Sequence, residues 1–263
     1  MAQTTETRNG ILQGPRRHRL AGTVSVIAGL LIWEFVSRVL VANPLFLAAP
    51  TQIVAAIVAL AASGELWRHL AISAIEFALG YAIACLIGIL AGFGMAKSAV
   101  IKQSLQPWVS GLYATPTIAL APLFILWLGI GVWSKVLVVI LLVFFPVAIN
   151  TEAGLRTTSE LLIDMLRSFG ATERQIFFKV ALPSALPFIL AGLKLGIGRG
   201  LIGVVVAELF GSRAGLGRLI GASADSFNMP DLFAGVVVLA IAGILMTAGF
   251  TWLERKLVPW TKD

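Results

Sequence analysis

Six stretches of mostly apolar residues alternate with shorter polar segments along the chain, at residues 20–41, 69–96, 108–128, 132–149, 186–210 and 232–253. A helix needs about 20 mostly apolar residues to cross a bilayer. The pattern therefore predicts an all-α membrane protein, a bundle of about six transmembrane helices. Residues 1–19 would form an N-terminal tail and residues 20–263 the transmembrane domain.

The composition agrees with a membrane protein and excludes several other classes. Of the 263 residues, 58% are hydrophobic and only 13% are charged, whereas soluble domains carry about 25% charged residues. A soluble enzyme, a disordered protein and a nucleic-acid-binding module are therefore excluded. The single Cys and two His residues give no basis for a disulfide framework or for a Cys/His metal site.

The net charge of +7 lies mainly in the segments between the apolar stretches, which is the distribution that fixes orientation in a bilayer. If the N-terminus is cytoplasmic, thirteen Lys and Arg residues fall in inside segments. Five fall outside or at the outer borders: Arg38, Arg68, Lys135, Arg213 and Arg218. We therefore expect both termini in the cytoplasm.

Small residues recur every fourth position in two of the predicted spans, which lets helix backbones approach closely in lipid. These helix-packing residues are Gly80, Ala84, Gly88 and Gly92 in the second span, and Gly192, Gly196 and Gly200 in the fifth. Proline residues bracket or interrupt two other spans. These are Pro107, Pro116 and Pro122 at the third span, and Pro146 in the fourth. Each proline removes a backbone donor and favours a kink.

A stretch of mixed polarity between the fourth and fifth spans, residues 151–183, predicts a helix, a glycine turn and a second helix. Thr157 and Glu160 have the spacing of a capping box, and Thr172 and Gln175 repeat it. Gly170 is suited to end the first helix because it can adopt the left-handed conformation. The element could pack against the ends of the spans, or its apolar face could bind in a groove of a separate soluble subunit.

The same stretch resembles the cytoplasmic EAA loop of ABC-importer permeases, in which EAA is followed at fixed spacing by Gly, Ile, Leu and Pro. The matching positions here are Asp164, Met165, Leu166, Gly170, Val180, Leu182 and Pro183, with Arg167 and Ala171 beside them. Asp replaces Glu, Met and Leu replace the two alanines, and Val replaces Ile. The segments APLFILWLGIG at 121–131 and AELFGSRAGLGRLI at 207–220 are similar to the nitrate, sulfonate, taurine and bicarbonate branch.

This resemblance implies a homodimeric pore in a bacterial inner membrane, two ATPase subunits bound to the loops, and a periplasmic binding protein that delivers the cargo. The chain has no G-x-x-x-x-G-K-[ST] phosphate loop. We therefore expect no cofactor and no catalytic or metal site in this chain, and we expect ATP and Mg to bind to the partner ATPases.

Ionisable residues within the apolar stretches are costly in a bilayer and are candidates for function. Glu76, Arg199 and Glu208 are the candidates for the translocation path or gate. Glu76 and Arg199 could instead form an ion pair between helices. Glu34, Lys194 and also Glu208 have a simpler interpretation, as residues at or near the membrane interface.

In sulfonate-type permeases a basic residue often stands where this chain has Glu76, and an acid there would repel an anion. We therefore keep two kinds of cargo, a sulfonate-, taurine- or nitrate-like solute and a neutral heterocycle such as a pyrimidine vitamin precursor. A proton-coupled secondary transporter using Glu76 is a further alternative, although no inverted repeat is evident. A membrane-embedded enzyme has no clustered nucleophile, base or metal ligands to support it.

Overall fold

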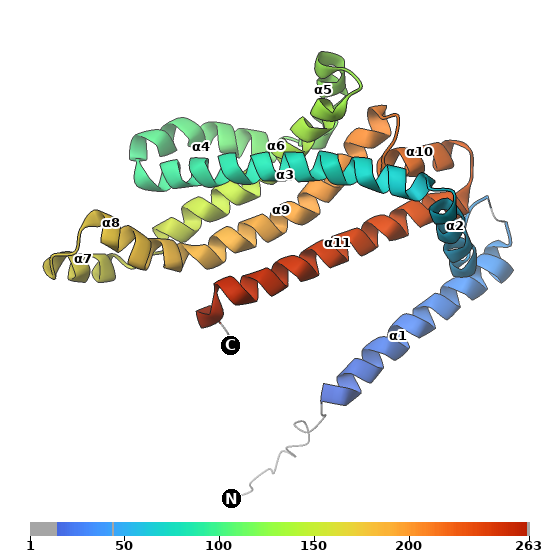
Figure 1. Cartoon of the computed structure of the whole chain (residues 1–263), viewed down its shortest axis with the longest axis horizontal. Helices are drawn as coiled ribbons and strands as arrows, with labels where there is room; N and C mark the ends of the chain where they lie inside the picture. Colours follow the sequence, from blue (N-terminus) through green and yellow to red (C-terminus); the bar gives the residue numbers. More distant parts are fainter. Residues whose placement is uncertain (1–14, 44, 262–263) are drawn as a thin grey trace, which may run out of the picture.

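A computed structural model describes residues 15–43 and 45–261, which are built from helices and connecting turns with no strand in those ranges. The first half contains α1 (Pro15–Phe35) with a π-helical extension (Val36–Val41), α2 (Pro50–Ala62), α3 (Glu65–Lys97), α4 (Ala99–Ala114), α5 (Ala121–Leu128) and α6 (Val132–Arg156). The second half contains α7 (Glu160–Ser168), α8 (Glu173–Ile176), α9 (Leu182–Gly211), α10 (Leu216–Asp225) and α11 (Met229–Leu257). Figure 1 shows the long helices running side by side.

Among the described residues, five helical segments are long and apolar enough to cross a membrane: Gly22–Val41, Glu65–Lys97, Val132–Arg156, Glu173–Gly211 and Met229–Leu257. The bent pair Ala99–Ala114 and Thr117–Leu128 makes a sixth if it counts as one span. The all-α membrane fold with about six spans is therefore confirmed. Of the predicted tail at 1–19, residues 1–14 lie outside the described residues, and residues 15–19 belong to α1.

The third predicted span is not one straight helix. The chain bends by 87° between α4 and the segment Thr117–Leu128. The break lies at Thr115, which is extended because the ring of the following Pro116 disfavours a helical conformation before it. Pro107 lies inside α4 without ending it, and Pro122 is in the first turn of α5, where no hydrogen bond is lost.

Two other boundaries differ from the sequence prediction. The fourth span was predicted to end at residue 149, but α6 continues to Arg156, so the polar element starts later than residue 151. Pro183 does not end the second loop helix. A π-helical turn at Phe177–Ala181 instead joins α8 to α9, and Pro183 takes a first-turn position in α9, where it is tolerated.

The core of the bundle is α6, which packs against both α3 and α9 more extensively than any other pair of helices. The small-residue stripe of α3 faces it. A Cβ atom at Gly80 would lie 2.6 Å from Cβ of Val139, and one at Gly92 would lie 2.5 Å from the carbonyl oxygen of Ala148. Ala84, between these glycines, is fully buried. These helices therefore approach at distances that a larger side chain would prevent.

The glycines of α9 make the same kind of contact from the other side. A Cβ at Gly192 would lie 2.9 Å from the carbonyl oxygen of Pro146, and one at Gly196 or Gly200 would lie 3.0 Å from the side chain of Val143. The inner face of α9 is therefore fixed against the middle of α6.

Two helices at one end of the bundle were not predicted. Helices α2 and α10 have 13 and 10 residues, too few for a span, and their apolar residues pack against each other and α11. In Figure 1 they lie at the end opposite α7 and α8. Together they cover that end of the bundle.

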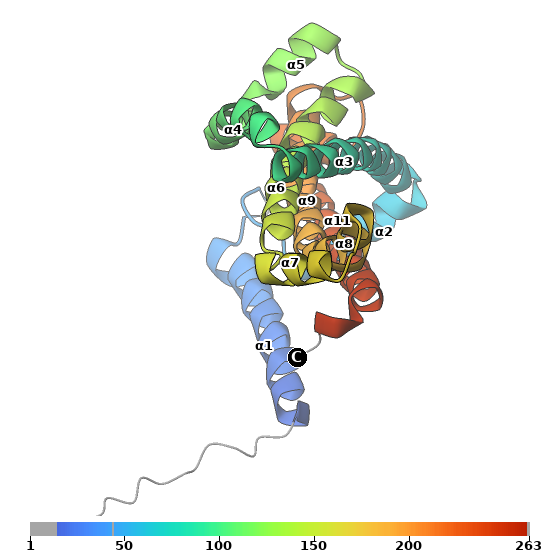
Figure 2. The ribbon, with the colours of Figure 1, turned by 90° about the vertical axis from the view of Figure 1, so that its left-hand side faces the viewer.

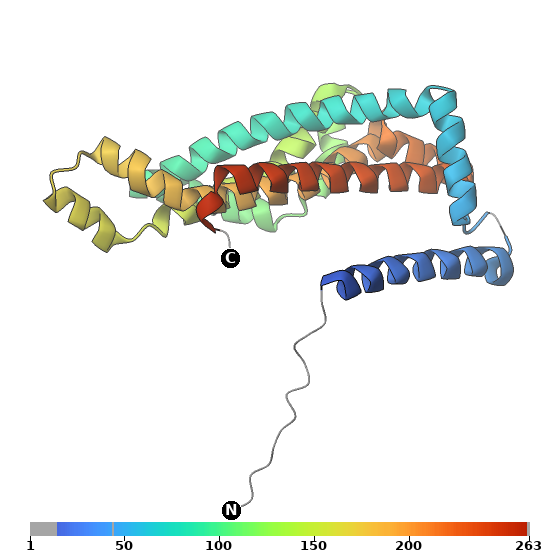
Figure 3. The same cartoon turned by 60° about the horizontal axis from the view of Figure 1, so that its bottom comes forward.

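Helix α1 stands apart from the rest of the chain. Figure 3 shows it separated from the bundle and joined to it at one end through α2. Only 6% of its most apolar window is buried, and its contacts include an edge-on ring contact of Trp33 with Phe233, 5.7 Å between centroids. Its apolar surface is therefore left for lipid or for another chain.

The packing predicts a position-dependent response to adding one methyl group. Gly92→Ala should lower the free energy of unfolding by about 1–3 kcal/mol, because a backbone oxygen of α6 occupies the space that the methyl group needs. Gly249→Ala in α11 is the control, since nothing lies within 4 Å of its added Cβ. The thermal unfolding midpoint in detergent measures both, and equal midpoints for the two variants would contradict the packing argument.

Candidate coupling surface and translocation path

Helices α7 and α8 form a hairpin that projects from one end of the bundle, near the end of α11 (Figures 1 and 2). The capping box predicted at Thr157 is absent. Thr157 instead ends α6, and its hydroxyl donates to the carbonyl of Gly154, while Ser159 is the N-cap of α7. The second capping box is present, with Thr172 and Gln175 bonded reciprocally.

Gly170 makes the turn of the hairpin with φ of +78°, a left-handed conformation that glycine adopts without a steric penalty. Arg167 bridges the turn, since its Nε donates to Glu173 at 3.0 Å and its Nη1 to Asp164 at 3.4 Å. The hydrogen bond and charge of Glu173, and more weakly Asp164, raise the pKa of the Arg167 guanidinium. The hairpin is thus closed by local sequence.

The hairpin presents an uncovered apolar face. Leu161, Met165 and Phe169, four residues apart, are 81%, 49% and 80% exposed. The other predicted coupling positions Leu166 and Ala171 lie in the same hairpin, Val180 lies in the π-helical turn, and Leu182 and Pro183 begin α9. This face lies outside the candidate spans.

At the opposite end of the bundle, a buried polar cluster joins α3, α9 and the turn before α10. Ser73 donates to Glu208 at 2.6 Å and accepts the backbone N–H of Leu216 at 2.8 Å. Glu208 also accepts the backbone N–H of Gly217 at 2.6 Å. Nδ1 of His69 accepts the N–H of Gly215 at 2.9 Å. Side chains of α3 and α9 therefore satisfy the free amides at the start of α10.

Glu76 and Lys135 complete this cluster. Both are 2% exposed, and Glu76 interacts electrostatically with Glu208 and with Lys135. Nζ of Lys135 donates to the carbonyl of Gly131 at 3.0 Å. Lys135, assigned from sequence to an outer border, therefore lies inside the protein, where its single positive charge attracts the two buried carboxylates of Glu76 and Glu208.

The positions of these carboxylates change the interpretation of the candidate path residues. Glu208 is fully buried and Glu76 nearly so, so neither side chain lies on the open surface of the chain. The ion pair suggested between Glu76 and Arg199 is not formed, since Arg199 bonds Tyr113 and Glu76 interacts electrostatically with Glu208 and Lys135. Lys194 pairs with Glu254 of α11 at 3.3 Å.

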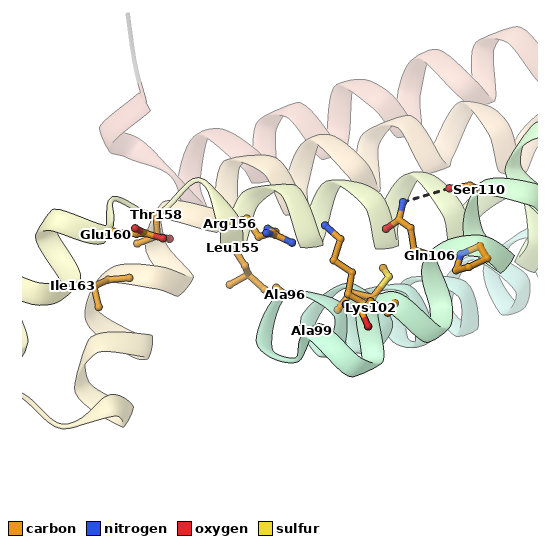
Figure 4. Close-up of a pocket in the computed structure, with 13 residues that line it drawn as sticks. Ala96, Ala99, Lys102, Gln106, Ser110, Leu155, Arg156, Thr158, Glu160 and Ile163 are labelled. Atoms are coloured by element: carbon orange, nitrogen blue, oxygen red, sulfur yellow. Dashed lines mark hydrogen bonds between the residues drawn. The ribbon is translucent and has the colours of Figure 1, made fainter.

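One face of α4 carries a row of polar side chains that includes Lys102, Gln103, Gln106, Ser110 and Tyr113. All but the last line a cavity of about 870 Å³ between α4 and the segment around the end of α6 and the start of α7 (Figure 4). Lys102 pairs with Glu152 at 2.7 Å, and Gln106 donates to Ser110 at 3.3 Å. The polar row leads from the hairpin end toward the middle of the bundle.

Arg199 meets this row at its inner end. Nη2 donates to the hydroxyl of Tyr113 at 2.9 Å, and the guanidinium lies over the Tyr113 ring, 5.1 Å from its centroid. Both side chains are exposed on the single chain. Of the three candidate path residues, Arg199 is the one that the structure leaves accessible.

Four residues of these sites were not predicted as site residues from the sequence: His69, Ser73, Lys135 and Tyr113. A signal for the first two was present, because residues 69, 73 and 76 continue at helical spacing the small-residue stripe that starts at Gly80. For Lys135 and Tyr113 no comparable signal exists, since their partners lie on other helices.

The family described as binding-protein-dependent transport system inner membrane component matches residues 84–263. The chain is 34% identical over 244 residues to the taurine transport system permease protein of Escherichia coli (strain K12), which covers 91% of this chain and 88% of the relative. It is 35% identical over 243 residues to the formylaminopyrimidine transport permease protein of Halalkalibacterium halodurans, covering 92% and 96%.

Other relatives and solved structures agree. A putative aliphatic sulfonates transport permease protein of Bacillus subtilis (strain 168) is 39% identical over 233 residues, covering 87% of this chain and 83% of the relative. An inward-facing structure of the MetNI methionine ABC transporter aligns with a TM-score of 0.60 at 22% identity, over 73% of this chain and 94% of that chain. At this identity the structural likeness concerns the fold.

The buried cluster predicts that Gly215 tolerates no side chain. Its φ of +128° with an extended ψ is a conformation reserved for glycine, and a Cβ would overlap the carboxylate of Glu208. Gly215→Ala should cost at least about 3 kcal/mol of stability through strain and overlap together.

Gly64→Ala provides the matched control, since Gly64 also has a positive φ of +83° but nothing lies within 4 Å of its Cβ. It should cost only about 1–2 kcal/mol. Thermal unfolding in detergent compares the two, and a Gly215→Ala variant as stable as Gly64→Ala would show that the contact with Glu208 is not tight.

Proposed function

The chain belongs to the family of binding-protein-dependent transport system inner membrane components and is the membrane permease subunit of an ABC importer; on this premise we propose how its surfaces are used. The α7–α8 hairpin binds a separate ATPase subunit. The polar row of α4 with Arg199 lines the path of a small polar solute. The exposed apolar face of the hairpin is the observation that carries the first assignment.

Binding of an ATPase at the hairpin follows from what the hairpin exposes. Leu161, Met165 and Phe169 form a short amphipathic helical face of the kind that fits a hydrophobic groove on a soluble partner. The turn behind them is rigid, because Gly170 and the Arg167 bridge fix it. The chain itself has no phosphate loop, so ATP and Mg bind to the partner.

The hairpin end is the cytoplasmic end in this proposal. The start of α1, the end of α11 and the hairpin lie toward the same end of the bundle (Figure 1). Basic residues gather there: Lys97, Lys102, Arg156, Arg174, Lys179, Arg255 and Lys256. The positive-inside rule then puts both termini in the cytoplasm and the α10 end on the periplasmic side of the bacterial inner membrane, where a binding protein delivers cargo.

Two copies of the chain form the pore. A single chain leaves the polar row of α4 exposed, and a charged or polar surface at membrane depth must face protein or water. The largely uncovered α1 offers apolar surface for contact with a second copy. A homodimer would enclose the polar row between its two halves and leave both hairpins free for two ATPases.

The cargo is a small polar solute. Relatives named for taurine and for aliphatic sulfonates support a solute of that kind. The objection raised by an acid at position 76 is weakened, because Glu76 is buried against Lys135 and does not face an open surface. The relative named for formylaminopyrimidine keeps a neutral heterocycle as the second candidate. The burial of Glu76 also disfavours proton-coupled transport, which needs an accessible carboxylate.

The orientation can be tested with two exposed serines at opposite ends of the bundle. In a Cys85→Ser background, a membrane-impermeant maleimide applied to intact cells should label Ser226→Cys, between α10 and α11, but not Ser168→Cys in the hairpin. After permeabilisation both should be labelled. Labelling of Ser168→Cys from outside would reverse the orientation and remove the hairpin from any cytoplasmic ATPase.

The apolar face of the hairpin predicts a loss of ATPase binding when it is made polar. Phe169→Ser should reduce co-purification of the ATPase by about ten-fold, as expected for a buried aromatic anchor. Phe227→Ser is the control, because Phe227 is 60% exposed at the opposite end of the bundle. It should leave ATPase binding unchanged. Equal retention of the ATPase by both variants would contradict the coupling role of this face.

A further inference from the structure

We propose that Arg199 and Tyr113 form a recognition site for the oxyanion group of the cargo, so that the transported solute is a small organic sulfonate or carboxylate. The inference rests on the proposed path along α4 and extends it by naming the chemical class of the cargo. The observation behind it is an accessible guanidinium at mid-depth whose counter-charge this chain does not supply.

The depth of Arg199 follows from its neighbours. Gly200, the next residue, packs against the side chains of Phe77 and Val143, which lie well inside α3 and α6. Arg199 is therefore far from either end of the bundle and cannot reach an interface by extending along the helix. A lone charge at such a depth is expensive in lipid, so the residue faces water, cargo or a charged partner.

A second copy of this chain does not provide that charged partner. Glu65, Glu173 and Asp231 lie at the first turns of their helical segments, far from the depth of Arg199, and the carboxylates deeper in the described spans already interact with groups of their own chain. Glu34 bonds Arg38 and Thr51, and Glu254 pairs with Lys194. Glu152 pairs with Lys102 and Arg156. Glu76 and Glu208 are buried around Lys135. A homodimer therefore adds a second guanidinium rather than a carboxylate.

The geometry leaves the pair ready to bind an oxyanion. Arg199 uses one N–H on Tyr113, and within the described part of the chain no other hydrogen bond or ion pair is formed by its guanidinium. A guanidinium has five N–H donors. The Tyr113 hydroxyl accepts from Arg199, so its own proton is available to donate. The Arg199 guanidinium and the Tyr113 hydroxyl thus offer N–H and O–H donors side by side. Such a pair of donors suits the oxygens of a planar carboxylate or of a tetrahedral sulfonate group.

The ring gives the pair rigidity. Tyr113 contacts Phe145 of α6 edge-on with 6.0 Å between ring centroids, and Phe145 is 3% exposed. Because Arg199 stacks on a ring that is itself held against the core, its guanidinium is positioned before cargo arrives. A preorganised donor loses less side-chain entropy on binding than a free one.

Binding to the permease–ATPase complex in lipid nanodiscs, without a binding protein, tests the proposal. The probes are ethanesulfonate and ethanesulfonamide, which have nearly the same shape but differ in charge, and equilibrium dialysis with labelled probes measures their Kd at millimolar concentrations. Wild type should bind the sulfonate at least about ten-fold more tightly, because charged hydrogen bonds are stronger than neutral ones.

Substitutions then assign the effect to the pair. Arg199→Gln should remove most of the preference for the sulfonate, Arg199→Lys should keep part of it, and Tyr113→Phe should weaken sulfonate binding several-fold while leaving the amide unaffected. Lys194→Gln is the control, because it removes a cation from the same helix that is paired with Glu254. It should bind both probes as wild type does.

Several results would overturn the proposal: no sulfonate binding by wild type, equal binding of the two probes, or an unchanged preference in Arg199→Gln. Dissociation of the dimer by Arg199→Gln, measured by light scattering, would also overturn it, since Arg199 would then serve an interface. Retention of the ATPase by the same preparations reports separately on the permease function. A complex that keeps its ATPase but shows no charge preference refutes this inference alone.

Discussion

The close approach of α6 to α3 and α9 is the constraint on which the rest of the structure depends. Lipid tails are as apolar as the helix surfaces, so association in the bilayer depends on contact between well-fitted surfaces rather than on hydrophobic burial. Glycines supply that fit on both neighbours of α6. They also fix rotation. Because Gly196 and Gly200 face inward, Arg199 between them in sequence is left on the outer face of α9, where it meets Tyr113.

The same register places the buried polar cluster. With Gly80 against Val139, the preceding turns of α3 bring Ser73 and His69 to the turn before α10, where Ser73 bonds Glu208 and His69 bonds the backbone of that turn. The cluster is tolerable inside the protein because its hydroxyl and backbone donors are bonded and Lys135 lies beside its carboxylates. At the other end, the hairpin helix α8 runs into α9 without a break. The helical segment Glu173–Gly211 would be about 58 Å long at 1.5 Å per residue, so one element connects the hairpin to the buried cluster.

The sequence predicted features that depend on local chemistry or on long periodic patterns. Five spans were recognised because their apolar runs are long, and the turn at Gly170 because a left-handed residue there favours glycine. The prediction was wrong where two local signals competed for the same residue. The spacing of Thr157 and Glu160 predicted that Thr157 would cap the start of α7. Because α6 extends to Arg156, Thr157 instead ends α6, and its hydroxyl donates to the carbonyl of Gly154. The partners of Lys135 and Tyr113 lie on distant helices, so no spacing could reveal them.

For ionisable residues at membrane depth, exposure and interaction partners distinguish structural from functional roles better than position in the sequence does. Buried Glu208 and Glu76 had the same sequence signature as Arg199, an ionisable residue in an apolar stretch. The structure divides them by exposure and by partners: the carboxylates are enclosed and interact with the charge of Lys135, whereas Arg199 is open and bonded to a neutral phenol. The enclosed carboxylates link α3 and α9 to their neighbours, and the charge of Lys135 offsets part of the cost of burying them. An open charge without a carboxylate needs water or a ligand. Among the described residues of the spans, Arg199 is such a group, and it lies at the inner end of the polar row that we propose lines the path.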